Sequence, residues 1–387
     1  MALVANHLVP VQCEQLEPGM YVAELDRSWL HTPFEARGFL ITQISQIEAL
    51  QRCCEYVYID PKRSDAMALL DLEATRLGPA IPLAEPANDD VPPLNGCREF
   101  LHDATSRIAA TVCAARRSGR LELDPIDADL DALVEHVLRW PDAIQWLLAT
   151  ESAHGYLNRR SLGTAVFSIL FGRQLGLDRE ALRELALGAL ILDIGKTIVP
   201  ITILAKPKRL NSVERSFARR HVEQSLTLVR LSTRVEPRVV NMVGAHHERL
   251  DGSGYPHGMT GTDIPLYARI AGIADTFDAM TQERSYATAR SGHDALRHLN
   301  TWRDIKFDAA PVDEFIHALG VFPVGTGVEL MDGSVGVVCR HNPGEPKRPD
   351  VLLTRDTHGH ALKTKPIVEP GPNRRIQRAL STTMPAT

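Results

Sequence analysis

The sequence predicts a mainly α-helical protein, in which an all-helical central domain is flanked by a small N-terminal α+β domain and a small C-terminal β appendage. Three observations predict this class. Nearly every segment of residues 141–319 has apolar residues at helical spacing, strand-like alternation is confined to the two ends, and a proline-rich linker occupies residues 82–96. With 387 residues the chain is long enough for two or three domains.

The N-terminal domain is predicted to cover residues 1–81. Its segment EPGMYVAEL (17–25) has the pattern of a turn followed by a strand, and CEYVYID (54–60) alternates like a second strand. Between them, TQISQIEALQRC (42–53) carries apolar residues at helical spacing. We therefore expect strands with one intervening helix.

After the linker, residues 97–140 are predicted to form connecting helices, and residues 141–319 the helical domain. Residues 320–372 are predicted as the β appendage, because Asp332-Gly333 between alternating apolar residues is a strong hairpin signal. A second strand pair is expected around residues 342–349. The last residues, 373–387, have no core-forming pattern and are predicted to be a flexible tail.

Composition excludes several classes of function. The formal net charge of -5 argues against a dominant nucleic-acid surface. No stretch approaches the ~18 uninterrupted apolar residues of a membrane span, and the first residues lack a signal-peptide pattern, so we expect a cytoplasmic protein with no membrane span. The 6 cysteines show no C-x-x-C spacing, and we assign them no function.

Four places in the helical domain hold residue types that ligate metals. They are Asp193 near Lys196, His221, the pair His246-His247, and Asp275. Each of the single residues also has a purely structural explanation. Asp193 could cap a helix end or pair with Lys196, and His221 could be an exposed helical residue beside two arginines. Asp275 could be paired with Arg269 or Arg284.

The pair His246-His247 is harder to explain structurally, because it ends an apolar helix and leads directly into the glycine-rich loop RLDGSGYPHG (249–258). Adjacent helical histidines diverge by about 100 degrees, so both reach one site only if the site lies between them or holds more than one metal. Imidazoles together with carboxylates suit a divalent iron, manganese or zinc ion that acts as a Lewis acid.

With these motifs in view, the sequence resembles the HD-GYP family, bacterial members of the HD phosphohydrolase superfamily that hydrolyse the second messenger cyclic di-GMP. The resemblance spans about residues 141–319, and residues 15–61 are similar to a small domain of unknown role that often precedes this catalytic domain. The motifs that carry it are DIGK (193–196), AKPKRLNSVE (205–214), RRH (219–221), HHERLDGSGYPHG (246–258), IPLYARIAGIADTFDAMTQERSY (264–286) and FDAAPVDEF (307–315).

Two positions depart from the family pattern. The family has a histidine before DIGK, where this chain has Leu192, and a further metal histidine one helix upstream, where alignment on Tyr156 gives Arg160. Leucine cannot coordinate a metal, and a permanently charged guanidinium repels a divalent cation. The resemblance therefore implies that one metal position is lost, and we hypothesise that Arg160 pairs with the remaining carboxylate of Asp275, since such a charge needs a counter-charge.

The resemblance implies roles for the residues that remain. Asp193 and Lys196 match catalytic positions, and Lys196, Tyr255 and Arg284 match positions that approach the substrate. The metal ligands would be Asp193, His221, His246, His247 and Asp275. They are sufficient for one ion rather than two, and a site without metal stays an alternative.

Two functions follow from this ligand set. The first is a cyclic di-GMP signalling protein with lost or much reduced hydrolysis, acting by binding the nucleotide or a partner, because two-metal hydrolysis needs both centres. The second is a working metal-dependent phosphodiesterase that gives pGpG or GMP. Expected partners are cyclic di-GMP, a signalling protein such as a diguanylate cyclase, and a second copy of the chain in a homodimer.

Overall fold

The chain folds into two units, one of residues Met1–Gly78 with Pro200–Pro207 and one of residues Pro79–Val199 with Lys208–Thr387. In this computed structural model the described residues are 9–13, 16–25, 34, 38–54, 56–60, 63–64, 94–150, 156–204, 206, 209–232, 235–282, 289–342, 345, 347–371 and 374–380. Most of the predicted linker, residues 82–93, lies outside them. None of the described helices is long and apolar enough to cross a membrane.

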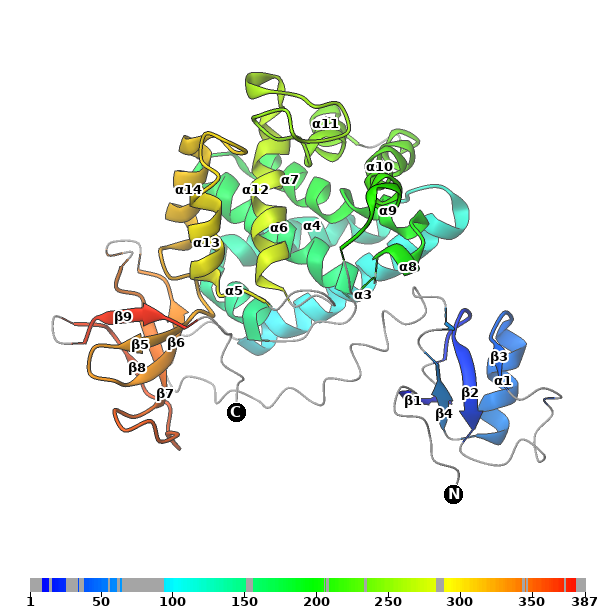
Figure 1. The fold of residues 1–387 in the computed structure, drawn as a ribbon, viewed down its shortest axis with the longest axis horizontal. Coiled ribbons are helices and arrows are strands. Elements are labelled where there is room, and N and C mark those ends of the chain that lie inside the picture. The colour runs from blue at the N-terminus through cyan, green and yellow to red at the C-terminus, as the bar shows by residue number, and fades with distance from the viewer. Residues whose placement is uncertain are drawn as a thin grey trace. The chain divides into compact units, whose positions relative to one another are not determined.

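The first unit contains an antiparallel sheet with the strand order β1-β4-β2-β3 (Figure 1). Side chains on one face of the sheet, such as Val57 and Ile59, are buried with Leu50 of the helix, as expected when alternate strand residues face a core. The predicted strands and helix of this domain are confirmed. Its elements are β1 (Val9–Gln12), β2 (Tyr21–Leu25), β3 (Phe39–Leu40), α1 (Ile44–Cys53), β4 (Tyr56–Ile59) and the separate short helix α8 (Ile201–Leu204).

The second unit is helical up to residue 319, as predicted. Its first helix begins at Leu94, inside the predicted linker. The helices are α3 (Leu94–Ser118), α4 (Asp124–Arg139), α5 (Pro141–Thr150), α6 (Tyr156–Gln174), α7 (Arg179–Ile191), η3 (Ile194–Ile198), α9 (Ser212–Arg219), α10 (His221–Arg230), α11 (Pro237–Ala245), η4 (Gly261–Asp263), α12 (Leu266–Thr281), α13 (Gly292–Asn300) and α14 (Ala309–Leu319).

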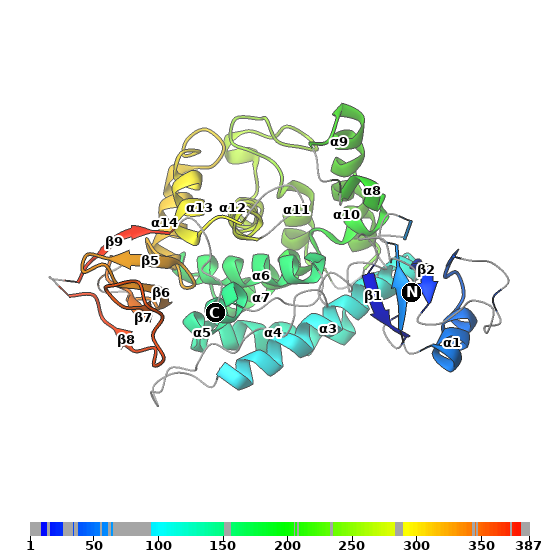
Figure 2. The ribbon, with the colours of Figure 1, turned by 60° about the horizontal axis from the view of Figure 1, so that its bottom comes forward.

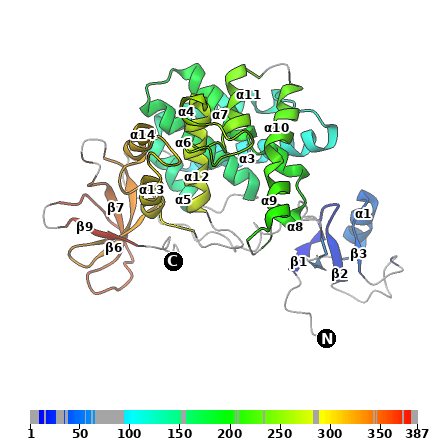
Figure 3. The same ribbon diagram turned by 45° about the horizontal axis from the view of Figure 1, so that its top comes forward.

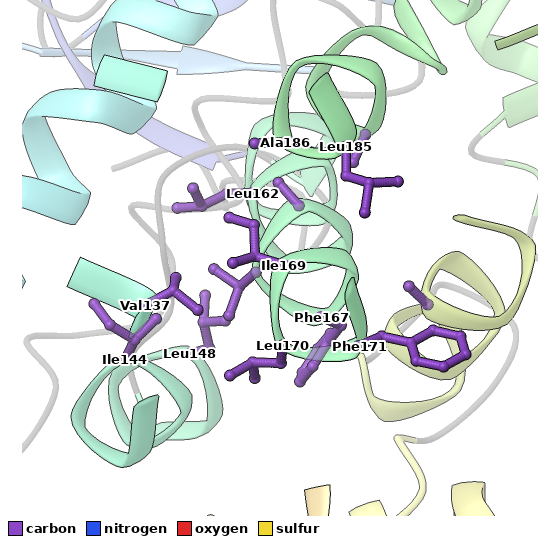
Figure 4. Close-up of a cluster of buried hydrophobic side chains, with 14 of the residues drawn as sticks. Val137, Ile144, Leu148, Leu162, Phe167, Ile169, Leu170, Phe171, Leu185 and Ala186 are labelled. Atoms are coloured by element: carbon purple, nitrogen blue, oxygen red, sulfur yellow. The ribbon is translucent and has the colours of Figure 1, made fainter. Parts of the chain in front are cut away.

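Helix α6 lies in the middle of the helical unit, where it packs against α7, α12 and α14 (Figure 1). Helix α4 packs against both α6 and α7 (Figure 2). In Figure 4, Ile144 of α5 and Leu185 of α7 lie on different sides of the apolar side chains of α6. The ring of Phe171 on α6 is fully buried and meets that of Phe315 on α14 edge to face, with centroids 5.3 Å apart. This core fixes the helices that carry the site.

A five-stranded antiparallel sheet follows the helices, with the order β8-β7-β6-β5-β9. The predicted hairpin is present, since Asp332-Gly333 connects the first two strands, and the next strand pair is joined through residues 341–349. The strands are β5 (Gly327–Leu330), β6 (Val335–Arg340), β7 (Asp350–Arg355), β8 (Ile367–Val368) and β9 (Ile376–Ala379).

The prediction of a flexible tail over residues 373–387 is wrong for Ile376–Ala379, which form β9 and pair with β5. The backbone of β9 uses the free edge of β5, and Arg378 binds Glu329 across the two strands, with Nε 2.8 Å from Oε2. A strand this short buries little of its own surface, so it leaves no apolar pattern in the sequence. Residues 381–387 lie outside the described part of the chain.

The second sheet packs on the helical unit near α5 and α13 (Figure 3), and Val328 and Val338 belong to the same buried cluster as the helices. At this junction Asp142, in the first turn of α5, lies beside Arg340 and His341 at the end of β6. Burial raises the pKa of Asp142 to about 6, and the backbone of His341 and the charge of Arg340 only partly oppose it.

Replacing Phe171 by alanine removes a fully buried ring from the centre of the core. We expect the free energy of unfolding to fall by about 3–5 kcal/mol, measured by urea unfolding followed by circular dichroism. Phe217→Ala on α9 is the matched control, because Phe217 is 42% exposed, and its cost should stay below about 1 kcal/mol. Equal effects of the two substitutions would contradict the packing described for α6.

Asp142→Asn should make stability less dependent on pH. A carboxyl whose pKa is raised from about 4 in the unfolded chain favours folding in its protonated form, so its contribution is complete below pH 4 and is lost as the pH rises to about 6. Asparagine stays neutral, so the variant should be more stable than the parent by about 2 kcal/mol at pH 7 and equal to it near pH 4. Urea unfolding at both pH values measures this, and a constant difference would contradict the assignment.

Candidate functional site

The turn after α7 places the first site residue. Leu192 is buried at the end of α7, and Asp193 follows directly at the start of η3. Ser225 of α10 holds this turn, because its Oγ accepts from the N–H of Gly195 at 2.9 Å and donates to the carbonyl of Leu192 at 2.8 Å. A Cβ at Gly195 would lie 2.1 Å from the carbonyl oxygen of His221, so only glycine permits this approach. The turn is therefore fixed beside the first residue of α10.

The end of α11 places the two adjacent histidines. The helix ends at Ala245, and the guanidinium of Arg249 donates to the carbonyl oxygens of His246 at 3.0 Å and Glu248 at 2.7 Å. These contacts satisfy carbonyl groups that have no partner within the helix. The rings of His246 and His247 lie 4.1 Å apart, measured between their centres, so both can reach one site although the two residues are adjacent in the chain.

The carboxylate of Glu248 fixes the loop that follows. It is buried and accepts from the backbone N–H groups of His257 at 2.7 Å and Met259 at 3.0 Å. A Cβ at Gly254 would lie 2.4 Å from Cα of Glu248, so the loop folds back tightly on this residue. As a result the ring of Tyr255 stacks on His247, with centroids 4.6 Å apart.

These elements bring four of the predicted ligands together. One nitrogen or oxygen atom from each of Asp193, His221, His246 and His247 lies within 4.8 Å of the others. Oδ1 of Asp193 is 3.2 Å from Nε2 of His221 and 3.8 Å from Nε2 of His246. The explanation of His221 as an exposed helical residue is wrong, since only 3% of its surface is accessible.

The hydrogen bonds of His221 and His246 direct the lone pair of each Nε2 atom into the site. Nδ1 of His221 lies 2.7 Å from the carbonyl oxygen of Ala218, and Nδ1 of His246 lies 2.8 Å from that of Val243. A carbonyl can only accept, so both Nδ1 atoms carry the proton and both Nε2 atoms are unprotonated in the neutral rings.

These Nε2 atoms and Oδ1 of Asp193 are buried and have no hydrogen-bond partner among the described residues. Acceptor atoms that converge in this way without a donor need a cation between them. Asp193, His221, His246 and His247 therefore fit a divalent metal, and His Nε2 with a carboxylate is a donor set that iron, manganese and zinc accept.

The electrostatics of the site keep its ligands in the metal-binding form. Burial lowers the pKa of His246 to about 4, although the charge of Asp193 opposes this, and burial also holds the pKa of His247 well below its usual value. Burial alone would raise the pKa of Asp193, but the charges of Lys196 and Arg160 together with His221 outweigh it and hold the pKa well below the usual range. At neutral pH both imidazoles are neutral and the carboxylate is ionised.

Arg160 of α6 occupies the other side of Asp193. Its Nη2 donates to Oδ1 of Asp275 at 2.7 Å, and its Nε lies 3.7 Å from Oδ2 of Asp193. The hypothesised pair of Arg160 with Asp275 is present, and the alternative partner Arg269 binds Asp308 instead, at 3.1 Å. Asp275 is not a member of the four-residue cluster. The guanidinium thus provides positive charge between two buried carboxylates.

The remaining predicted site residues have different outcomes. Lys196 is an ion-pair partner of Asp193, as the structural explanation allowed. Burial raises the pKa of Tyr255, so its phenol stays protonated and can donate. Arg284 lies outside the described residues. The sequence reasoning missed the positioning roles of Ser225 and Arg249. No local signal marks Ser225, because its partners on the DIGK turn are about 30 residues away in the chain.

A helical domain that gathers buried histidine and aspartate ligands at one point defines the class of metal-dependent HD-domain proteins. Residues 143–310 match the HD domain family, and residues 8–116 match a domain of unknown function, DUF3391. The chain is 33% identical to cyclic di-GMP phosphodiesterase PA4108 of Pseudomonas aeruginosa, over 85% of this chain and 80% of that protein. The chain therefore belongs to the HD-GYP family of HD-domain proteins.

Other relatives match shorter parts. The response regulator RpfG of Xanthomonas campestris, named a cyclic di-GMP phosphodiesterase, is 38% identical over 38% of this chain and 39% of its own length. The 3'3'-cGAMP-specific phosphodiesterase 1 of Vibrio cholerae is 41% identical over 32% of this chain and 28% of its own length. Among solved structures, Bd1817, an HDG"Y"P protein of Bdellovibrio bacteriovorus, has a TM-score of 0.50 at 14% identity and covers 80% of this chain and 98% of its own, which shows the shared fold.

Arg160→Met should destabilise the protein strongly, because it leaves the buried carboxylate of Asp275 without its counter-charge. We expect a loss of about 3–5 kcal/mol in the free energy of unfolding at pH 7, measured by urea titration. The double variant Arg160→Met with Asp275→Asn removes both charges and should recover a large part of this loss. If the losses in Arg160→Met and Asp275→Asn simply add up to the loss in the double variant, the two residues are not coupled.

Proposed function

We propose that this chain is a cyclic di-GMP signalling protein of the HD-GYP family in which hydrolysis is lost or much reduced, and that it acts by binding the nucleotide or a partner protein. The observation that carries the proposal is the contact of Arg160 with both Asp275 and Asp193. A guanidinium held by two carboxylates keeps a divalent ion out of this side of the site, because like charges repel in a buried setting.

The neighbouring position supports the same conclusion. Leu192 is 1% exposed and stands where the resemblance implies a histidine ligand, so its side chain adds no donor atom to the site. One ion, held by Asp193, His221, His246 and His247, is the metal content that we propose. A single ion can polarise one phosphodiester oxygen, but the second positive centre that two-metal hydrolysis uses would be missing.

The ligand that we propose is cyclic di-GMP, on the strength of the relative from Pseudomonas aeruginosa, which matches most of both chains. The related cyclic dinucleotide 3'3'-cGAMP is the first competitor to test, because a shorter match bears that name. Lys196, which is half-buried and paired with Asp193, and the protonated phenol of Tyr255 lie beside the cluster and suit an anionic phosphodiester.

A second candidate function is a working phosphodiesterase with one metal, giving pGpG or GMP. The observation that favours it is the intact cluster of one carboxylate and three imidazoles, which satisfies the donor count of a catalytic metal site. In that case Arg160 would take over the stabilisation of negative charge on the phosphodiester.

Metal content and turnover distinguish the two functions. We expect the purified protein to bind at most one equivalent of Fe²⁺, Mn²⁺ or Zn²⁺, and to turn over cyclic di-GMP at least about 100-fold more slowly than an intact family member, since a lost charge-stabilising centre typically costs this much. Elemental analysis and product chromatography with added Mn²⁺ or Fe²⁺ measure both. Two equivalents of metal together with full turnover would refute the proposal.

The variant Arg160→His with Leu192→His restores both imidazoles and should gain a second equivalent of metal. His246→Ala in the parent is the control, and it should lose the first equivalent. Calorimetric titration with cyclic di-GMP and 3'3'-cGAMP then tests the binding role separately. If the parent binds neither nucleotide, the function shifts to interaction with a partner protein.

A further inference from the structure

Arg219, the last residue of α9, lies at the solvent side of the site. Arg219 is exposed. Helix α9 has no buried residue, and all but two half-buried residues of it are exposed. Its guanidinium carbon is 4.6 Å from the centre of the Tyr255 ring. Among the residues that the structure describes, no carboxylate forms an ion pair with it, so its charge is available.

The rings below Arg219 connect it to the metal cluster. Tyr255 stacks on His247, and His247 lies 4.1 Å from His246, again measured between ring centres. Arg219 is therefore the outermost member of a column of flat groups that ends at the buried ligands. The guanidinium of Arg219 lies over the tyrosine ring, and among the described residues its N–H groups make no hydrogen bond, so they can donate to a ligand.

A cyclic dinucleotide carries two phosphodiester groups, and the metal cluster can hold only one of them. We infer that Arg219 binds the phosphate group that lies at the mouth of the site, with the guanidinium edge donating to its oxygens. This inference rests on the proposed function for the identity of the nucleotide. An arginine is suited to the task, because its planar fork matches phosphate oxygens and stays charged at all relevant pH values.

The alternative is that Arg219 only stabilises the loop by its contact with Tyr255. Such exposed cation–π contacts have a modest effect. A role in binding can be separated from this one, since only binding of an anion makes the dissociation constant depend on the charge of residue 219 and on salt.

The test compares four proteins by calorimetric titration with cyclic di-GMP: the parent, Arg219→Ala, Arg219→Lys and Arg220→Ala. Arg220 is the matched control, because it is the adjacent exposed arginine and its guanidinium lies over Phe217, 4.9 Å from the ring centre. We expect Arg219→Ala to raise Kd about 10- to 100-fold and to weaken its dependence on NaCl, as loss of a charge-assisted hydrogen bond predicts. The Kd of Arg219→Lys should lie between those of the parent and Arg219→Ala, and the Kd of Arg220→Ala should be within about twofold of that of the parent.

The outcomes test the role of Arg219 and the identity of the nucleotide separately. Suppose that the parent binds cyclic di-GMP. If Arg219→Ala binds it equally well, or binds it more weakly with an unchanged salt dependence and a lower Tm, then Arg219 does not bind phosphate. The proposed function would stand in both cases. If the parent does not bind cyclic di-GMP, the proposed nucleotide is wrong, and the same four proteins are titrated with inorganic pyrophosphate. Pyrophosphate binding that is lost only in the Arg219 variants would keep the assignment, and its absence would overturn it.

Discussion

The buried carboxylate of Asp193 is the charge around which the helical unit is arranged. It lies at the end of an apolar helix, where an uncompensated charge would cost several kcal/mol, so it needs positive charge beside it. Lys196 and Arg160 bring positive charge from η3 and α6, and the histidines of α10 and α11 bring lone pairs that require a cation. The packing of α6 against α7 and α12 therefore also determines the chemistry of the site.

The positions of the metal ligands depend on residues that are not ligands themselves. Ser225 ties the turn of Asp193 to α10, Arg249 completes the end of α11, and Glu248 closes the loop that sets Tyr255 over His247. Each is a polar group that satisfies backbone atoms and leaves the imidazole edges free. A site built in this way has its geometry before any ion or nucleotide arrives, which reduces the entropy lost on binding.

Much of this arrangement could be predicted from the sequence, because helices, the Asp332-Gly333 hairpin and the clustered ligand types leave local patterns. What could not be predicted depends on contacts between distant segments. Arg160 and Asp275 are 115 residues apart, so their pairing was only a hypothesis until the fold placed α6 beside α12. The strand β9 has too short an apolar pattern to be recognised, and it exists because β5 offers a free edge. Arg219 lies in the RRH motif (219–221), but its contact with Tyr255 depends on the folded loop and leaves no local pattern.

One consequence of Arg160 concerns the surroundings of the protein. A bound metal exchanges with the medium, so chelators, iron supply and oxidants can alter a site that depends on it. The guanidinium beside Asp275 is part of the polypeptide and keeps its charge at every physiological pH, so this half of the site cannot be emptied or oxidised. Only the cluster of Asp193, His221, His246 and His247 would then respond to metal supply and redox state, whereas the charge that Arg160 supplies is constant.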